Sequence, residues 1–324
     1  MYRAVWTAGL LALPQVGSGV VSPPVSLQEL AGHPVLRRSL HRRLVTDRVA
    51  PNGAAGVNRG AGPQWYIEEQ RAGAEFVQRG VVMENAGWVS TGWRILDWGI
   101  ARQGPDGGFP GTGDPFHSVS LFVEALSRAL LLDPAAATPA RVRAARAAAE
   151  WLLLPNVAGR GEAHNRPYTH RRWILAAALA QAAQAANQPQ LMRAARSYAR
   201  AGLQLQAENG VNPEKGGADI GYQMFGVVMA ARFVAAGPDR RLENSVIRMI
   251  DKAATWAGTR IGEDGRVDAT GSTRTSIETA RDGRLKQVPH HSIVEGLAYS
   301  AALTGDSSYH VMAERVARRR GWLR

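Results

Sequence analysis

The stretch that decides the fold reads GEAHNRPYTHRRW over residues 161–173 and continues as ILAAALAQAAQAA over residues 174–186. Its first part gathers five polar side chains within eight positions: His164, Asn165, Tyr168, His170 and Arg171. Its second part is rich in Ala, which has the highest helix propensity of any residue. The sequence therefore predicts a structural helix with a polar loop at its mouth, and that loop is the first place to look for chemistry.

From about Gln64 onward, the whole chain shows the sequence pattern of successive helices. Apolar residues recur three and four positions apart, which is typical of amphipathic helices. The pattern predicts helices over residues 65–80, 88–103, 115–132, 139–154, 169–187, 189–208, 220–236, 240–258, 290–304 and 307–320. Several begin at or just after a proline, which the first helical turn tolerates. Strand patterns are nearly absent, so the expected fold class is all-α.

The predicted helices repeat with a fixed period. Trp98 and Trp151 end the second and fourth helices and lie 53 residues apart, and Trp256 follows after 105 residues, or about two such periods. Similar Gly-containing loops separate the units, such as Asp106-Gly107 and Gly216-Gly217. A fixed period of two helices and a long loop indicates stacked helical hairpins. We expect an incomplete α/α toroid of about five hairpins.

Polar or aromatic residues stand at equivalent positions in successive units. His117, His170, Tyr222 and the pair His290-His291 open their helices at intervals of 53, 52 and 68 residues, the last lengthened by a polar insertion at about 268–287. In a ring of hairpins, such positions converge at one rim. The spacing therefore predicts a single cleft. The alternative is that these side chains only cap helices or pack at repeat interfaces.

The domain assignment follows from composition along the chain. Residues 1–22 are similar to a secretory signal peptide, with Arg3 before an apolar stretch. Residues 23–62 are predicted to form an irregular N-terminal arm, and residues 63–324 the toroid. The expected location is secreted or periplasmic, with the cytoplasm as the alternative. The absence of cysteine leaves the compartment open and excludes thiolate chemistry.

The net charge of +12, from 39 Lys and Arg against 27 Asp and Glu, favours a polyanionic partner. We expect an acidic polysaccharide or oligosaccharide. Nucleic acid is not expected, because no binding motif accompanies the charge. No apolar run is long enough for a transmembrane helix. The histidines His117, His164, His170 and His290 could converge on a metal ion, but they show no ligand spacing such as His-Glu-x-x-His, so the expectation is no metal and no cofactor.

Three functions suit these residues. β-Elimination on a uronate polysaccharide needs a carboxylate neutraliser, a base and an acid, which Asn, His, Arg and Tyr can supply. Glycoside hydrolysis usually needs two carboxyl groups. Loop acids that could serve are Asp106, Glu214, Asp219, Glu263, Asp264 and Asp268. A non-catalytic, carbohydrate-binding helical repeat protein is the third alternative.

The cluster of His164, Asn165 and Arg171 at a helix mouth, with the segment GADIGYQ at 217–223 one unit later, resembles the α/α-toroid polysaccharide lyases, the group that includes the alginate lyases. The resemblance covers roughly residues 88–320. It implies that Asn165, together with Arg171, neutralises the substrate carboxylate. It also implies that His170 or His164 is the base and Tyr222 the acid. The remaining candidates, expected to bind substrate, are His117, Tyr168, Trp173, Glu214, Asp219, Gln223, His290 and His291.

Overall fold

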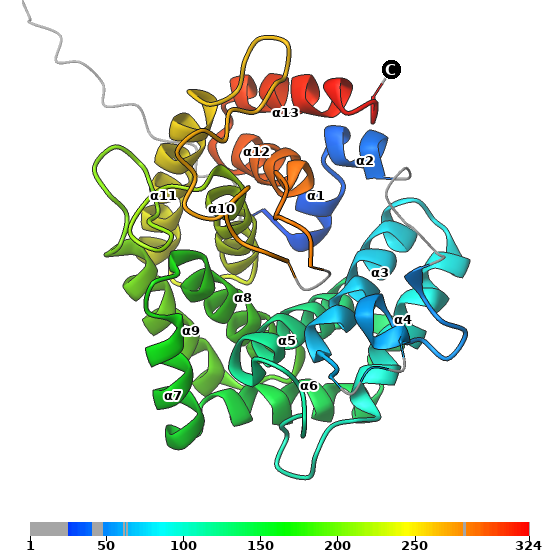
Figure 1. Ribbon diagram of the computed structural model, residues 1–324. Coiled ribbons are helices and arrows are strands. Elements are labelled where there is room, and N and C mark those ends of the chain that lie inside the picture. Colours follow the sequence, from blue (N-terminus) through cyan, green and yellow to red (C-terminus); the bar gives the residue numbers. More distant parts are fainter. Residues whose placement is uncertain (1–24, 41–47, 61, 63, 281–282, 324) are drawn as a thin grey trace, which may run out of the picture.

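The computed structural model describes residues 25–40, 48–60, 62, 64–280 and 283–323. The predicted signal peptide at 1–22 lies outside the described residues and stays a prediction. Five helical hairpins follow one another around a ring in the described part of the chain (Figure 1). They are α3 (Ala72–Val82) with α4 (Ala86–Ile100), α5 (Pro115–Leu132) with α6 (Pro139–Leu152), α8 (Thr169–Ala185) with α9 (Pro189–Leu203), α10 (Ile220–Ala235) with α11 (Arg240–Gly258), and α12 (His290–Thr304) with α13 (Ser307–Arg319).

The first helix of each hairpin lies on the inside of the ring, where α3 contacts α5, α5 contacts α8, α8 contacts α10, and α10 contacts α12. The second helices lie outside them. Within the described residues there are only isolated bridges and no strands. The prediction of an incomplete α/α toroid of about five hairpins is therefore confirmed. No helix of this described part has both the length and the apolar character that crossing a membrane requires.

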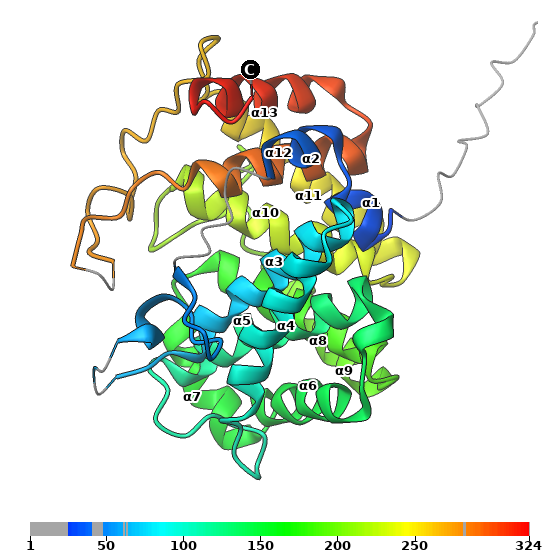
Figure 2. The same cartoon turned by 90° about the vertical axis from the view of Figure 1, so that its right-hand side faces the viewer.

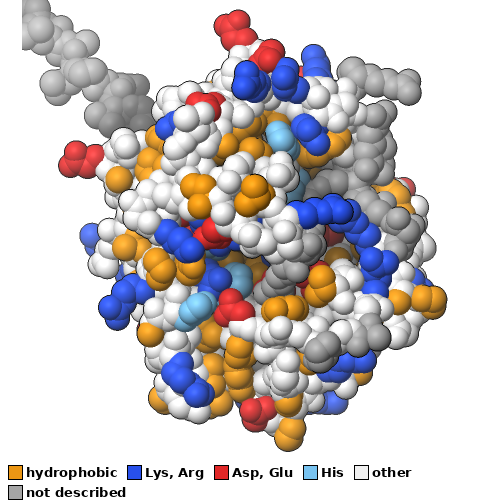
Figure 3. All heavy atoms as spheres, viewed as in Figure 1, with side chains coloured by type: hydrophobic (Ala, Val, Ile, Leu, Met, Phe, Trp, Pro, Cys, Tyr) orange, Lys and Arg blue, Asp and Glu red, His pale blue; other side chains and the backbone are white. Residues whose placement is uncertain are grey.

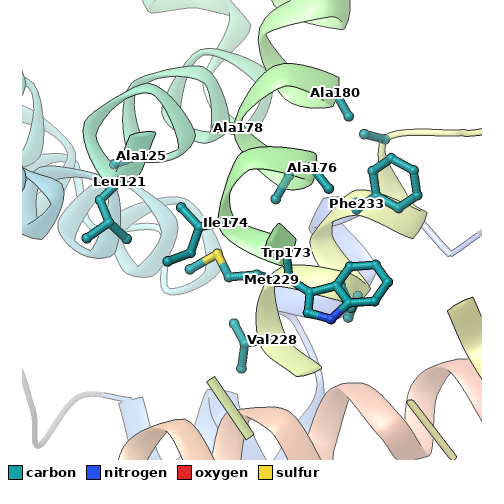
Figure 4. Close-up of a cluster of buried hydrophobic side chains, with 14 of the residues drawn as sticks. Leu121, Ala125, Trp173, Ile174, Ala176, Ala178, Ala180, Val228, Met229 and Phe233 are labelled. Carbon is teal, nitrogen blue, oxygen red and sulfur yellow. The ribbon is translucent and has the colours of Figure 1, made fainter. Parts of the chain in front are cut away.

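The burial pattern explains which helices lie inside. Nearly every residue of α8 from Thr169 to Ala183 is buried, as expected for a helix that is apolar on all sides. Trp173, Ile174 and Ala178 contribute to a cluster that also takes side chains from α5 and α10 (Figure 4). By contrast, α9 buries only one stripe, Leu191, Ala195, Ala199 and Gly202. Its other face carries Arg and Gln, so it can only be an outer helix.

The N-terminal arm differs from the expectation of irregular structure. It contains α1 (Leu27–Ala31) and α2 (Pro34–Leu40), and a short 3-10 helix, η2 (Gly56–Arg59), follows. Leu30 and Val35 are completely buried in the main core. Helix α1 contacts α3, α5 and α12, and α2 contacts α12 and α13. The two short helices therefore occupy the gap between the last hairpin and the first.

The polar stretch at residues 161–173 is also more helical than expected. Residues up to Asn165 belong to α7 (Pro155–Asn165), so the loop before α8 is only residues 166–168. Gly161 lets α7 lie against the ring of Phe116, because a Cβ at this position would lie 2.1 Å from Cγ of that ring. Two further 3-10 helices complete the fold, η3 (Ile67–Arg71) before α3 and η4 (Pro134–Ala136) after α5.

Deep inside the ring, charged side chains from four helices form a buried network. Arg232 on α10 donates to Glu124 on α5 at 3.0 Å and to Glu295 on α12 at 2.8 Å. Arg128 donates to Glu124 at 2.9 Å and to Glu75 on α3 at 3.2 Å. Removing one partner from such a network leaves an uncompensated buried charge, so the pairs fix the inner helices in register.

Candidate active site

The N-terminal ends of α5, α8 and α10 bring the predicted rim residues together. The ring of His170 lies 6.4 Å from that of His117 and 4.7 Å from that of Tyr222, measured between centroids. The rings of Tyr168 and Phe225 each lie 6.0 Å from it. Four aromatic or imidazole rings therefore surround His170. Figure 3 shows histidine, basic and acidic side chains gathered in a depression of the face viewed in Figure 1.

His170 is paired with Glu214. Its Nδ1 lies 2.8 Å from Oε2 of Glu214, and its backbone N–H donates to Oε1 at 2.9 Å. Both side chains are almost completely buried. A carboxylate only accepts hydrogen bonds, so Nδ1 carries the hydrogen and Nε2 carries the lone pair. No hydrogen bond from a described residue reaches Nε2, which can therefore accept a proton from a ligand.

Local backbone pairing holds this dyad in place. The segment around Tyr168 forms a bridge with Glu214, and Lys215 N–H donates to the carbonyl of Pro167 at 2.7 Å. The hydroxyl of Thr169 donates to the carbonyl of Pro213 at 2.6 Å. The start of α8 is thus fixed to the loop before α10. The two members of the dyad come from consecutive repeats.

Burial is the largest influence on the pKa of His170, and it lowers that pKa. The charge and the hydrogen bond of Glu214 raise it, whereas the nearby charges of Arg274 and Arg171 lower it further. The net result is a pKa below the ordinary histidine value. The imidazole is therefore neutral at pH 7 and available as a base.

Arg171 and Asn165 form a second polar group beside the dyad. Arg171 donates to Oδ1 of Asn165 at 2.6 Å and to Oδ2 of Asp114 at 3.3 Å. Its guanidinium also lies 4.4 Å from the centroid of the Tyr168 ring. Nδ2 of the buried Asn165 and Nε of Arg171 have no partner among the described residues. These two buried donors are therefore unsatisfied within the described structure.

The insertion between α11 and α12 contributes Arg274, which the sequence did not single out. Its guanidinium lies 3.6 Å from the Tyr222 centroid and 4.8 Å from the Tyr168 centroid, and NH1 lies 3.6 Å from Oε2 of Glu214. Arg274 is 5% exposed, and NH1 has no hydrogen-bond partner in the described structure. The insertion, which projects from the end at which α12 begins (Figure 2), thus places a cation within the aromatic cluster.

Two carboxylates attach the insertion between α11 and α12 to the rest of the toroid. Asp219 caps α10 by accepting from Tyr222 N–H at 2.9 Å, and its other oxygen accepts from Thr275 at 2.8 Å. Glu278 accepts from Arg274 and from Lys286, and it also pairs with Lys215 on the loop before α10. Burial alone would raise the pKa of Glu278, but these three cations lower it to about 2. The insertion is therefore tied down over the whole range of physiological pH.

Several predicted residues lie apart from this cluster. Trp173 is fully buried in the core, Gln223 fixes the 210–212 loop, and Asp219 serves as the cap described above. His164 is largely exposed, 3.9 Å from Asp114. His290 lies near Arg320, and His291 lines a separate small cavity with Glu295. The loop acids Asp106, Asp264 and Asp268 are exposed and accept hydrogen bonds from their own turns.

Besides Arg274, sequence reasoning missed three members of the site. Glu68 on η3 accepts from Ser118 at 3.0 Å and lies 4.0 Å from His117. Asp114 contacts Arg171, and Lys286 lies 5.2 Å from the Tyr222 ring. The only sequence signal for Arg274 and Lys286 was the lengthened interval between Tyr222 and His290. Glu68 lies in the first turn of η3, as His117, His170 and Tyr222 lie in the first turns of their helices, but it carries a carboxylate instead of a ring.

Comparison with known proteins gives information at the level of the fold. No family model matches the sequence, and no curated protein is similar to it. Solved structures do match. A glycosyl hydrolase of family 88 from Bacteroides vulgatus superposes with a TM-score of 0.60 at 10% identity, over 90% of this chain and 84% of that chain. A sugar epimerase from a ruminal bacterium gives a TM-score of 0.58 at 13% identity, over 88% and 86%.

An unsaturated glucuronyl hydrolase specific for heparin gives a TM-score of 0.54 at 12% identity, over 90% of this chain and 83% of that chain. At such low identities the similarity establishes the fold, which is the α/α toroid found in these sugar-processing enzymes. The likeness extends over most of each chain. The reaction has to be argued from the site itself.

Proposed function

We propose that this protein is a carbohydrate-active enzyme that cleaves a uronate-containing saccharide by β-elimination. The observation that carries the proposal is the buried His170–Glu214 pair, whose free ring nitrogen lies among aromatic rings and close to the cations Arg171 and Arg274. A neutral, oriented imidazole is suited to removing a proton, and nearby guanidinium groups are suited to binding a carboxylate.

In the proposed reaction, Arg274 and the Arg171–Asn165 group bind the carboxylate of the sugar. Their positive charge stabilises the negative charge that develops when the neighbouring C5–H bond breaks. Nε2 of His170 takes that proton, and the released electron pair forms the C4–C5 double bond. The C4–O bond then breaks, and the hydroxyl of Tyr222 protonates the leaving oxygen. Solvent afterwards removes the proton from His170 and returns one to Tyr222.

Elimination is favoured over hydrolysis by the carboxyl groups at hand. Glu214 is committed to His170, Glu278 to three cations, and Asp219 to capping α10. The exposed loop acids stabilise their own turns. Glu68 and Asp114 remain, but hydrolysis would require them to act on one glycosidic bond, with no direct part for the His170–Glu214 pair.

A second candidate is epimerisation or isomerisation of a sugar. The observation that favours it is the edge-to-face pair of His170 and His117, whose centroids are 6.4 Å apart. Two imidazoles on a substrate carbon next to a carbonyl could remove a proton from one face and return it to the other. This reaction shares its first step, proton removal by His170, with elimination. The fold also occurs in a sugar epimerase.

One panel of assays separates these reactions. Purified protein is incubated with alginate, pectate, a glucuronan and their oligomers in D₂O. Elimination produces the ultraviolet absorbance of an unsaturated uronide, and His170→Asn abolishes it. Deuterium incorporation without chain cleavage would indicate epimerisation instead. New reducing ends without the chromophore would indicate hydrolysis, and either result would overturn the elimination proposal.

A further inference from the structure

A second cavity opens beside the candidate active site, between α7 and the start of α5. Its volume is about 530 Å³, within the range of ligand pockets. Apolar and charged side chains both contribute to its wall: Asp114, Pro115, Phe116, Trp151, Val157, Arg160, Gly161 and His164. The catalytic arrangement proposed above makes no use of this space.

The cavity adjoins the site through Asp114. This residue lines the cavity, and its Oδ2 accepts from Arg171, the residue next to His170. Its Oδ1 lies 3.9 Å from Nε2 of His164, which also lines the cavity. Asp114 has a left-handed backbone with φ 43° and ψ 60°, a conformation that costs energy for a residue other than glycine. The backbone is thus strained at the point where the two spaces meet.

The chemistry of the wall suits a pyranose ring. Trp151 and Phe116 provide aromatic surface on which the C–H face of a sugar can pack. Arg160 is exposed and donates Nε to the carbonyl of Asn156 at 3.0 Å. It makes no ion pair within the described part of the chain. Since Asp114 is paired with Arg171, the charge of Arg160 remains available to an anionic group.

We infer that this cavity is a subsite for the sugar unit adjacent to the reacting one, with Trp151 beneath the ring and Arg160 facing its carboxylate. This inference rests on the proposed function, because it takes the reacting unit to lie at His170. It adds the substrate class: oligomers in which the unit next to the scissile bond also carries an acid. A single monosaccharide would leave the cavity empty.

The experiment measures binding of alginate, pectate and glucuronan oligomers of one to four units to the His170→Asn protein by calorimetry. We expect affinity to rise at least tenfold from one unit to two. Adding Arg160→Gln should weaken binding of the dimer by about tenfold to hundredfold, as expected for loss of a charge-assisted contact. Binding of the monomer should be unchanged. Trp151→Ala should also remove this gain. Arg143→Gln, an exposed arginine on α6, is the matched control.

The outcomes separate the subsite from the reaction. If the Arg160→Gln and Trp151→Ala proteins are folded and bind every length as the Arg143→Gln control does, the subsite is refuted while elimination can still be observed. If the variants lose the dimer gain but no oligomer is ever cleaved, the subsite is supported and the reaction is refuted. If no uronate oligomer binds at all, both are refuted.

Discussion

Replacing Glu214 with Gln is expected to move the lone pair of His170 to the wrong ring nitrogen. In the structure, one oxygen of Glu214 accepts the backbone N–H of His170 at 2.9 Å and the other lies 2.8 Å from Nδ1. An amide has only one oxygen, which is needed by the backbone N–H. Its NH₂ group must then face Nδ1 as a donor, so the imidazole hydrogen moves to Nε2. The proposed base can no longer accept a proton there.

The size of the effect follows from the role of the group. Loss of a positioned general base costs about 10²–10⁴-fold in kcat, or roughly 3–5 kcal/mol of transition-state stabilisation. Loss of the Glu214 charge also removes an influence that raises the pKa of His170, so that pKa should fall further below the ordinary histidine value. KM should change little, because Glu214 is buried behind the ring.

Long-range ¹⁵N–¹H spectra report the tautomer directly. The chain has eight histidines, and the signals of His170 are those lost in the His170→Asn protein. We expect hydrogen on Nδ1 in the wild type and on Nε2 in the Glu214→Gln variant. Glu214→Asp is the control, since a carboxylate of shorter reach keeps the tautomer and a larger share of the activity. An unchanged tautomer in Glu214→Gln, or a kcat within threefold of the wild type, would refute the reasoning.

Three further predictions concern binding, pH and stability. Arg274→Gln should raise KM for a uronate substrate about tenfold or more, through loss of a charge-assisted contact. The same variant should leave binding of a carboxyl-reduced analogue unaffected in a competition assay. The acidic limb of kcat/KM should lie below pH 6.5, because burial lowers the pKa of the base His170 and only its neutral form reacts; a limb above pH 7 would contradict this assignment. Arg232→Met should cost about 3–5 kcal/mol in chemical denaturation, because Glu295 and Glu124 would lose the buried cation that they share and Glu124 would keep only Arg128. A loss below 1 kcal/mol would show that the network contributes little.

A pH effect on folding is expected at His33. Burial, and then the charges of His310 and Arg38, lower its pKa to about 4. The unfolded chain then binds a proton at higher pH than the folded chain, so stability falls as pH drops from about 6.5 toward 4. At pH 5 this group should cost about 1–2 kcal/mol. His33→Gln should flatten the pH dependence of urea unfolding between pH 7 and 5; an unchanged slope would contradict the assignment.

The ring architecture could be predicted because its signals are local and repeated. The ten expected helices all occur, since the period of the apolar residues depends only on neighbouring positions in the chain. The helices α1, α2 and α7 were not predicted as such. The first two are very short, and α7 contains two glycines and a polar C-terminal end, so its stability comes from packing against Phe116.

The candidate site could be predicted only in part. Repeat spacing predicted His117, His170 and Tyr222 as members of one site, and the structure places their side-chain rings in one cluster. The partner of His170 was expected among the substrate-binding residues, because nothing in the sequence shows that the loop before α10 pairs with the start of α8. Arg274 lies in a stretch with no helical period. The position of that stretch depends on tertiary contacts, since Thr275 donates to Asp219 and Glu278 pairs with Lys215. Such contacts between distant segments leave no periodic trace.

The two short helices at the start of the described chain have a consequence for how the molecule opens. A linear stack of hairpins exposes an unprotected face at each end, so its terminal repeats unfold first. Here α1 contacts both α3 and α12, α2 contacts α12 and α13, and Arg38 of α2 pairs with Glu314 on the last helix. The first and last hairpins therefore share a neighbour instead of facing water. Amide hydrogen exchange should show comparable protection in α3 and α12, and deleting residues 1–40 should turn a single unfolding transition into one that begins at both of those hairpins.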